Sequence, residues 1–395
     1  MPYTKQYTKA VTAIHNKDAW ENLPAQTTPI TAESLDIIES GISKNDDRIV
    51  EMSEIYDKNS VNLGRKSNTD VGERSLTAGT DVEASGTNAS ALGYMTVASG
   101  SAAHAQGAGA KATGNYSHAE GAGTEASGYA SHAEGNGSKA SEVYAHAEGN
   151  GTKASKSAAH AEGSDTEASG DYSHAEGYNT KAAGKASHAE GDSTNATESY
   201  AHAEGEYSTA NGYYSHAEGY STKTLASAAH AEGNTTTASG ADSHAEGNNT
   251  TASASDAHAE GYGTVAGGAD SHAEGSNTKA VGQATHTEGG YTMATAPYSH
   301  AEGLNTTASG YAQHVQGKYN VVDSQYAHII GGGTDDDNRK NIHTIDWEGN
   351  AVFSGNVTDG NGDSIQTVKK IAEAGGMEPL TNTEIMAIIN KASIA

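Results

Sequence analysis

Histidine and glutamate recur at a fixed spacing through most of this 395-residue chain, and both residue types can bind metal ions or exchange protons. A histidine falls every fourteen residues from His104 to His328, which accounts for 17 of the 19 histidines. Glutamate follows two residues later from Glu120 to Glu302, fourteen times in all. Imidazole and carboxylate groups are ligands for zinc and nickel, and they also pair with each other. The spacing therefore indicates either an array of metal sites or a ladder of paired polar groups.

The candidate site consists of these two rows. The histidines are His104, His118, His132, His146, His160, His174, His188, His202, His216, His230, His244, His258, His272, His286, His300, His314 and His328. The glutamates are Glu120, Glu134, Glu148, Glu162, Glu176, Glu190, Glu204, Glu218, Glu232, Glu246, Glu260, Glu274, Glu288 and Glu302.

The elements that position the two rows follow from the fourteen-residue period. A fixed short period predicts one structural unit stacked on itself. Within each unit two short stretches alternate with period two, which predicts two short strands. In the coil of His244, residues 243–247 (SHAEG) and 250–253 (TTAS) place small Ser, Ala, Gly and Thr side chains on one shared inner face. The fold class is therefore an all-β solenoid with a narrow interior, in which inner threonine hydroxyls can bond backbone groups at the corners.

Composition supports an elongated solenoid and excludes several function classes. Hydrophobic residues make up 34% of the chain, and 48 residues are glycine. Such a chain cannot form a broad core of large side chains, and disorder would not keep a strict period over so many residues. The net charge of -27 argues against a nucleic-acid partner, whose phosphates would be repelled. The chain has no cysteine and no apolar run of membrane-spanning length, so we expect no thiol metal site and no membrane insertion.

The uniform outer face predicts an interface. His and Glu alternate with the inner residues, so they point away from the roll, and every coil can present the same pair only if every coil meets the same neighbour. The spacing Ala-x-Gly-x-x-(Ser/Thr)-x-Ala-x-Gly resembles the head of YadA-type trimeric adhesins over roughly residues 62–331. That resemblance implies a left-handed parallel β-roll, three of which pack around a common axis, with the His and Glu positions facing the axis.

In such a trimer we predict a trimer-interface ladder of His and Glu, with no bound metal and no other cofactor. Three rolls would bring three imidazoles together in each layer, which is a plausible zinc or nickel geometry. The ladder is preferred because buried polar groups usually pair with protein. Glutamates stacked about 4.8 Å apart repel unless they are neutralised. If histidinium from neighbouring chains neutralises them, the pKa of the histidines is raised and the trimer is least stable at alkaline pH.

Two flanking regions carry further predictions. Before the repeat, apolar residues alternate at spacings of three and four, which predicts a short coiled-coil helix; a lone amphipathic helix is the alternative. The predicted seam is Leu35, Ile38, Ile42, Asn45, Ile49, Met52 and Tyr56. After the repeat we predict a small β region and then two helices, which start near residues 364 and 381.

A second resemblance concerns the end of the repeat. Residues 317–320 (GKYN), 329–334 (IIGGGT) and 339–350 (RKNIHTIDWEGN) resemble a junction in bacteriophage tail fibre and appendage proteins. There the junction often leads into a self-cleaving chaperone domain, for which too few residues follow here. The N-terminal region looks like the virion-attachment end of such fibres.

The predicted segments are therefore five. They are a virion-attachment segment at 1–30, a trimeric coiled coil at 31–60, a β-roll shaft at 61–331, a β segment at 332–363 and a helical tail at 364–395.

The expected protein is a non-enzymatic homotrimeric fibre of a phage or prophage-derived particle, involved in host attachment. Its partners would be itself, a baseplate, tail or capsid protein at the N-terminal segment, and a host cell-surface glycan or protein. Its location would be the virion, assembled in the host cytoplasm without a signal peptide. The alternatives are a bacterial surface trimeric adhesin, which lacks a signal and an anchor here, and a precursor with an autoproteolytic chaperone remnant.

Tyrosines recur just before the Ser/Ala-His pair. They are Tyr116, Tyr144, Tyr172, Tyr200, Tyr214, Tyr298 and Tyr326. Exposed aromatic rows can bind sugars by stacking, and the preferred alternative is packing against a neighbouring roll.

Overall fold

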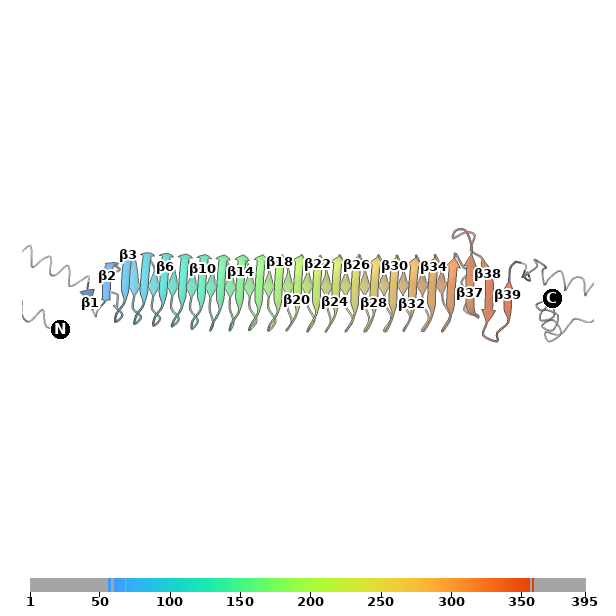
Figure 1. The fold of residues 1–395 in the computed structure, drawn as a ribbon, viewed down its shortest axis with the longest axis horizontal. Helices are drawn as coiled ribbons and strands as arrows, with labels where there is room; N and C mark the ends of the chain where they lie inside the picture. The colour runs from blue at the N-terminus through green and yellow to red at the C-terminus, as the bar shows by residue number, and fades with distance from the viewer. Residues whose placement is uncertain (1–55, 58–59, 68, 356, 359–395) are drawn as a thin grey trace, which may run out of the picture.

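The protein is a rod of stacked coils (Figure 1). The computed structural model describes residues 56–57, 60–67, 69–355 and 357–358. These residues form an all-β, predominantly parallel solenoid of about 19 turns, which confirms the predicted solenoid. The rod is long and thin because each coil contacts only its two neighbours along the axis.

Each full coil contains one strand of five residues and one of two residues. In the coil of His244 these are β26 (His244–Asn248) and β27 (Thr251–Ala252). The other five-residue strands are β4 (Ser90–Tyr94), β6 (His104–Ala108), β8 (His118–Ala122), β10 (His132–Asn136), β12 (His146–Asn150), β14 (His160–Ser164), β16 (His174–Tyr178), β18 (His188–Asp192), β20 (His202–Glu206), β22 (His216–Tyr220), β24 (His230–Asn234), β28 (His258–Tyr262), β30 (His272–Ser276), β32 (His286–Gly290), β34 (His300–Leu304) and β36 (His314–Lys318). The other two-residue strands of the coils are β5 (Val97–Ala98), β7 (Lys111–Ala112), β9 (Glu125–Ala126), β11 (Lys139–Ala140), β13 (Lys153–Ala154), β15 (Glu167–Ala168), β17 (Lys181–Ala182), β19 (Asn195–Ala196), β21 (Thr209–Ala210), β23 (Lys223–Thr224), β25 (Thr237–Ala238), β29 (Val265–Ala266), β31 (Lys279–Ala280), β33 (Met293–Ala294) and β35 (Thr307–Ala308).

Parallel pairing places identical positions of successive coils side by side. His132 is paired with His118, and two residues later Glu134 is paired with Glu120. The short strands pair in the same way, and the two sets form two separate parallel sheets. A shift of one residue would turn every small inner residue outward, so the alternation within each coil specifies the register.

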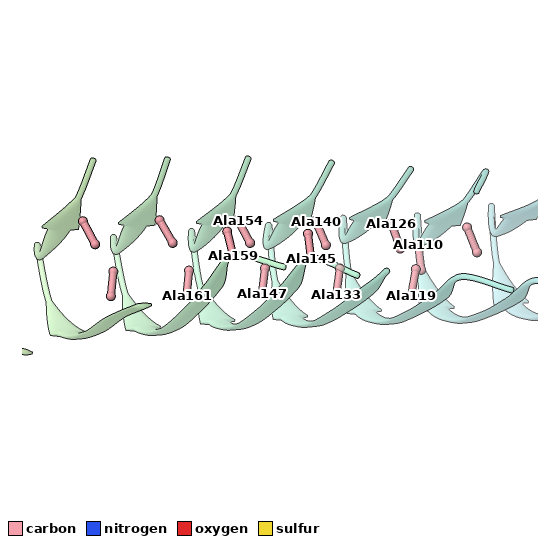
Figure 2. Close-up of a cluster of buried hydrophobic side chains, with 14 of the residues drawn as sticks. Ala110, Ala119, Ala126, Ala133, Ala140, Ala145, Ala147, Ala154, Ala159 and Ala161 are labelled. Carbon is pink, nitrogen blue, oxygen red and sulfur yellow. The ribbon is translucent and has the colours of Figure 1, made fainter. Parts of the chain in front are cut away.

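The core is two rows of alanine that face each other across the roll (Figure 2). Ala133 and Ala147 project from long strands, and Ala140 and Ala154 project from short strands toward them. Their exposed fraction is 0%. The inner serines and threonines are buried as well, so the predicted inner face is confirmed. Thr224 and Thr287 take alanine positions within the repeat, and Val315 and Ile329 do so at its end.

Inner serine and threonine hydroxyls behave differently. Ser187 Oγ donates to the carbonyl oxygen of Gly184 at 2.8 Å, and Ser243 Oγ donates to that of Gly240 at 2.7 Å. Most inner threonines, such as Thr180 and Thr250, have a buried hydroxyl with no hydrogen-bond partner among the described residues. The expectation that threonine hydroxyls bond the corners is therefore wrong for most coils.

The first coils lack histidine, as the sequence indicates. They contain β2 (Ser60–Arg65) and β3 (Leu76–Ala84), and Leu76 lies in register with Ser90. Tyr56, the last position of the predicted coiled-coil seam, lies in β1 (Tyr56–Asp57), which pairs antiparallel with β2. Tyr56 is therefore in a strand and not in a helix, because β1 pairs with the edge of the first coil.

The opposite end closes with antiparallel strands. β37 (Tyr326–Gly332) continues the parallel stack, and β38 (Asn341–Asp346) and β39 (Ala351–Phe353) then follow as antiparallel neighbours. Gln313 fills the last coil, where its Nε2 donates to the carbonyl oxygen of Tyr326 at 2.7 Å. The predicted β segment at 332–363 contains β38 and β39.

The predicted helices lie outside the described residues. This holds for the seam positions Leu35 to Met52 and for the helices expected after residues 364 and 381. Among the described residues no helix is long and apolar enough to span a membrane.

We expect Ala203→Leu to destabilise the solenoid by about 1–3 kcal/mol, because Ala203 is fully buried in a row of alanines without room for a larger side chain. Urea unfolding monitored by circular dichroism measures this cost. Val315→Ile is the control, because that row already holds Val315 and Ile329 at the end of the repeat, and we expect it to cost less than about 1 kcal/mol. Equal costs for both variants would contradict a narrow central core.

Candidate functional site

The histidines of successive coils form one continuous stack on the outer face of the long strands. From His118 to His314, neighbouring ring centroids lie 4.6–4.9 Å apart and ring planes differ by 1–19°. The stack changes at its ends, where His104 meets His118 edge-on at 82° and His328 is tilted by 36° from His314. The parallel register produces this stack, because it repeats one side-chain position at the strand spacing.

Eleven of the fourteen glutamates lie within 4.0 Å of the histidine of their own strand. The distance from His118 Nε2 to Glu120 Oε2 is 3.6 Å, and the equivalent distances in the other close pairs reach 4.0 Å. These distances are close contacts that exceed hydrogen-bonding length. Near the end of the repeat His314 Nε2 instead lies 3.7 Å from Glu302 Oε1 of the preceding coil.

The Nε2 atoms of the stack are buried without a hydrogen-bond partner among the described residues. They belong to His118, His132, His146, His160, His174, His188, His202, His216, His230, His244, His258, His272, His286, His300 and His314. The glutamates that could pair with them remain partly exposed. Within one chain the two rows therefore form a stack of contacts, and the hydrogen bonds of the predicted ladder are not made.

The pKa of ten histidines of the row is lowered. Burial lowers the pKa of His160 most, and the neighbouring imidazoles of His146 and His174 lower it further. Glu162 and Glu148 raise this pKa, but by less. Burial and then neighbouring histidines likewise lower the pKa of His118, His146, His188, His202, His230, His244, His272, His300 and His328. Within one chain, burial and then the neighbouring imidazoles lower these pKa values. The predicted rise in pKa concerns a trimer, in which glutamates of neighbouring chains face the histidines, and it stays a prediction.

Several coils bring three potential metal ligands together. His160, Glu162 and His174 have ligand atoms within 4.8 Å of one another, and four further groups are similar. The rings of His160 and His174 are parallel within 1°, with centroids 4.7 Å apart. Lone pairs of parallel rings do not converge, and an ion about 2.0–2.1 Å from each nitrogen needs those atoms closer together. The stack as arranged does not form a metal site within one chain, and the prediction of no metal stays a prediction.

The outward row of the short strands has a different character. It varies from coil to coil, with Lys139 Nζ 3.6 Å from Glu125 Oε2 and Lys181 Nζ 3.4 Å from Glu167 Oε2. Exposed pairs of this kind contribute little to stability. This row is a solvated surface, in contrast to the uniform row of His and Glu.

The tyrosines lie at the corner between each short strand and the next long strand. Tyr116, Tyr144 and Tyr214 are exposed there, as are Tyr172, Tyr200 and Tyr298. Tyr326 instead lies partly buried against the cluster that contains Ile329. The sequence reasoning missed Tyr129, Tyr213 and Tyr311, which precede the predicted position by one residue and share the same corner. The fourteen-residue period could have revealed them, because each stands three residues before a histidine of the row.

No protein-family model and no curated protein matches this chain.

Proposed function

We propose that this chain is the shaft of a homotrimeric, non-enzymatic fibre. The fibre would connect a phage or prophage-derived particle to the surface of its host. The observation that carries the proposal is the uniform His/Glu face, with its row of partnerless buried Nε2 atoms. The left-handed roll, the coiled coil at 31–60 and the attachment of residues 1–30 to a baseplate, tail or capsid protein belong to the same proposal.

The uniform face supports self-association. Fourteen coils present the same His and Glu at the same spacing, while the other outward row varies freely. Only a partner with the same repeat meets every coil in the same way, and a second and third copy of this chain provide that repeat. Three copies around one axis give every His/Glu row the same surroundings, as closed symmetry requires.

Buried polar atoms without partners support the same conclusion. A buried donor or acceptor that makes no hydrogen bond costs about 1–3 kcal/mol. This cost recurs in fifteen coils here. Small rotations of the half-exposed glutamates in neighbouring chains would supply acceptors for these imidazoles, so association would relieve the cost.

The rod shape supports a spacer. A parallel solenoid with backbone hydrogen bonds in every coil is stiff along its length, and it holds its two ends far apart (Figure 1). A bacterial surface adhesin would use the same shaft, and the resemblance at residues 317–350 favours the phage fibre.

The test is the mass of the purified protein in solution by sedimentation equilibrium. We expect three times the 40.3 kDa of one chain. In the variant Glu162→Lys/Glu176→Lys/Glu190→Lys we expect monomers, because each coil would bring six extra positive charges to a three-fold axis.

The control is Glu83→Lys/Glu125→Lys/Glu167→Lys, which changes charge equally on the other outward row. This control should remain trimeric. A monomeric wild-type chain, or a trimer that both variants preserve equally, would contradict assembly through the His/Glu face.

A further inference from the structure

A tyrosine ridge runs along one corner of the solenoid in two main clusters. The first cluster is Tyr116, Tyr129 and Tyr144, and the second is Tyr200, Tyr213 and Tyr214. Their exposed fractions range from 46% to 66%, so about half or more of each residue is open to solvent in the chain. Exposed aromatic groups of this size at adjacent positions mark binding surfaces more often than packing.

The backbone at this corner does not favour tyrosine. Tyr116, Tyr144 and Tyr214 have φ of 61°, 58° and 57°, which is the left-handed region that bulky side chains avoid. Equivalent coils carry Ala130 or Asp242 with similar φ. The positive φ is therefore a property of this corner in most coils, and the fold does not need an aromatic ring there.

Ring contacts hold the clusters together. The centroid of Tyr129 lies 5.4 Å from that of Tyr116 and 6.0 Å from that of Tyr144, in edge-to-face arrangements. Tyr200 and Tyr214 stack at 4.9 Å with planes 2° apart. These contacts restrict the rings and line them up along the rod, so a ligand loses little entropy in ordering them.

We propose that these two clusters bind neutral glycan chains of the host surface, a proposal that rests on the proposed host-attachment function. The C–H face of a pyranose ring stacks on the electron-rich face of tyrosine, and the phenol hydroxyl exchanges hydrogen bonds with sugar hydroxyls. The coils advance by about 4.8 Å, close to the length of one sugar unit in an extended chain. Neighbouring coils can therefore present a phenol hydroxyl or a free ring face to successive sugars, with only the outer faces free in the stacked pair of Tyr200 and Tyr214.

Charge selects the class of glycan. The chain has a net charge of -27, and Glu142 lies beside the first cluster at its corner. An anionic sugar would be repelled, as a nucleic acid would be. A neutral glycan meets no such penalty.

A neighbouring chain is a poorer occupant than a glycan. A trimer contact repeats in every coil, as the His/Glu face does. The tyrosines occur in some coils and are replaced in others by residues such as Ala158 and Ala186 at the same corner. A discontinuous patch fits local ligand sites.

The experiment uses the full chain on a microarray of neutral and anionic glycans, followed by titration calorimetry with each glycan bound. The test variant replaces all six cluster residues: Tyr116→Ala, Tyr129→Ala, Tyr144→Ala, Tyr200→Ala, Tyr213→Ala and Tyr214→Ala. The control variant replaces four exposed tyrosines outside the two clusters that have no tyrosine ring contact among the described residues: Tyr94→Ala, Tyr178→Ala, Tyr262→Ala and Tyr291→Ala.

We expect the wild type and the control variant to bind neutral glycans, and the test variant to bind them at least about tenfold more weakly. Circular dichroism should show the same solenoid in all three proteins. Absence of neutral glycan binding by the wild type, binding of anionic glycans alone, or equal binding by the test variant would overturn the proposal.

Sedimentation of the same samples separates this proposal from the proposed shaft. If the protein is a trimer but binds no neutral glycan, the proposed tyrosine site is wrong and the proposed trimeric shaft is retained. If the protein is a monomer and its glycan binding depends on the six tyrosines, the proposed trimeric shaft is wrong and the proposed tyrosine site is retained.

Discussion

Gly135→Ala should open the solenoid at its coil and cost about 3 kcal/mol or more of local stability. Gly135 has φ of +102°, a conformation that residues with a Cβ rarely adopt. A Cβ at this position would lie 2.1 Å from the carbonyl oxygen of Gly149 in the next coil. That oxygen belongs to the backbone of a paired strand, so relief requires the two coils to separate.

The matched control lies two residues away. Gly137 has φ of +71°, and a Cβ added there would meet no atom within 4 Å. Equivalent positions hold Asp165 and Asn179 with φ of 56° and 53°. Gly137→Ala should therefore cost only about 1 kcal/mol, the penalty of the left-handed conformation alone.

Hydrogen exchange measured by mass spectrometry distinguishes the two variants. Solenoid coils are stabilised by their nearest neighbours, so the defect should be local. In Gly135→Ala we expect lost protection of amides in β8, β10 and β12, with β28 and β30 unchanged. Equal loss of protection in both variants would show that close backbone approach does not decide the glycine row.

Acidification should destabilise the protein progressively below pH 6.5. The histidines have a lowered pKa in the folded chain, so the unfolded chain binds more protons as the pH falls. Stability is therefore fully present above the unfolded pKa of about 6.5 and is lost as the pH falls through the lowered folded pKa. Ten histidines share this direction, so their effects should accumulate along the stack.

Urea unfolding at intervals from pH 8 to pH 5 measures this dependence. We expect the midpoint concentration of urea to be constant above pH 7 and to decrease toward pH 5. Protonated imidazoles less than 5 Å apart would also repel across the proposed three-fold axis, so the trimer should dissociate in the same range.

A block variant localises the effect to the stack. His160→Gln, His174→Gln, His188→Gln, His202→Gln and His216→Gln together remove five adjacent imidazoles. Hydrogen exchange within β14 to β22 should then lose its pH dependence beyond the intrinsic rate, while β28 and β30 keep theirs as an internal control. Stability that instead falls as the pH rises would mean that glutamates of neighbouring chains raise the pKa of the histidines.

The sequence alone determined the repeat and what lies inside it. A period of fourteen with no slip aligns His244 with its copies, and a shift of one residue would turn Ala245 outward. Small residues at every inner position require a narrow roll. These are properties of spacing and size, which are read from a single chain without knowing any contact.

The tertiary structure decided the chemistry on the surface. Burial on the long-strand face and then the two stacked imidazoles lower the pKa of His160 within one chain, which the sequence alone did not indicate. Tyr56 lies in β1, which pairs with the edge of the first coil, although the spacing of Tyr56 from Met52 continues the predicted helical seam. Tyr129 joins the ridge through contacts with the preceding and following coils. Each outcome depends on neighbours about fourteen residues away or at an unpaired edge, and such neighbours are established only when the coils are stacked.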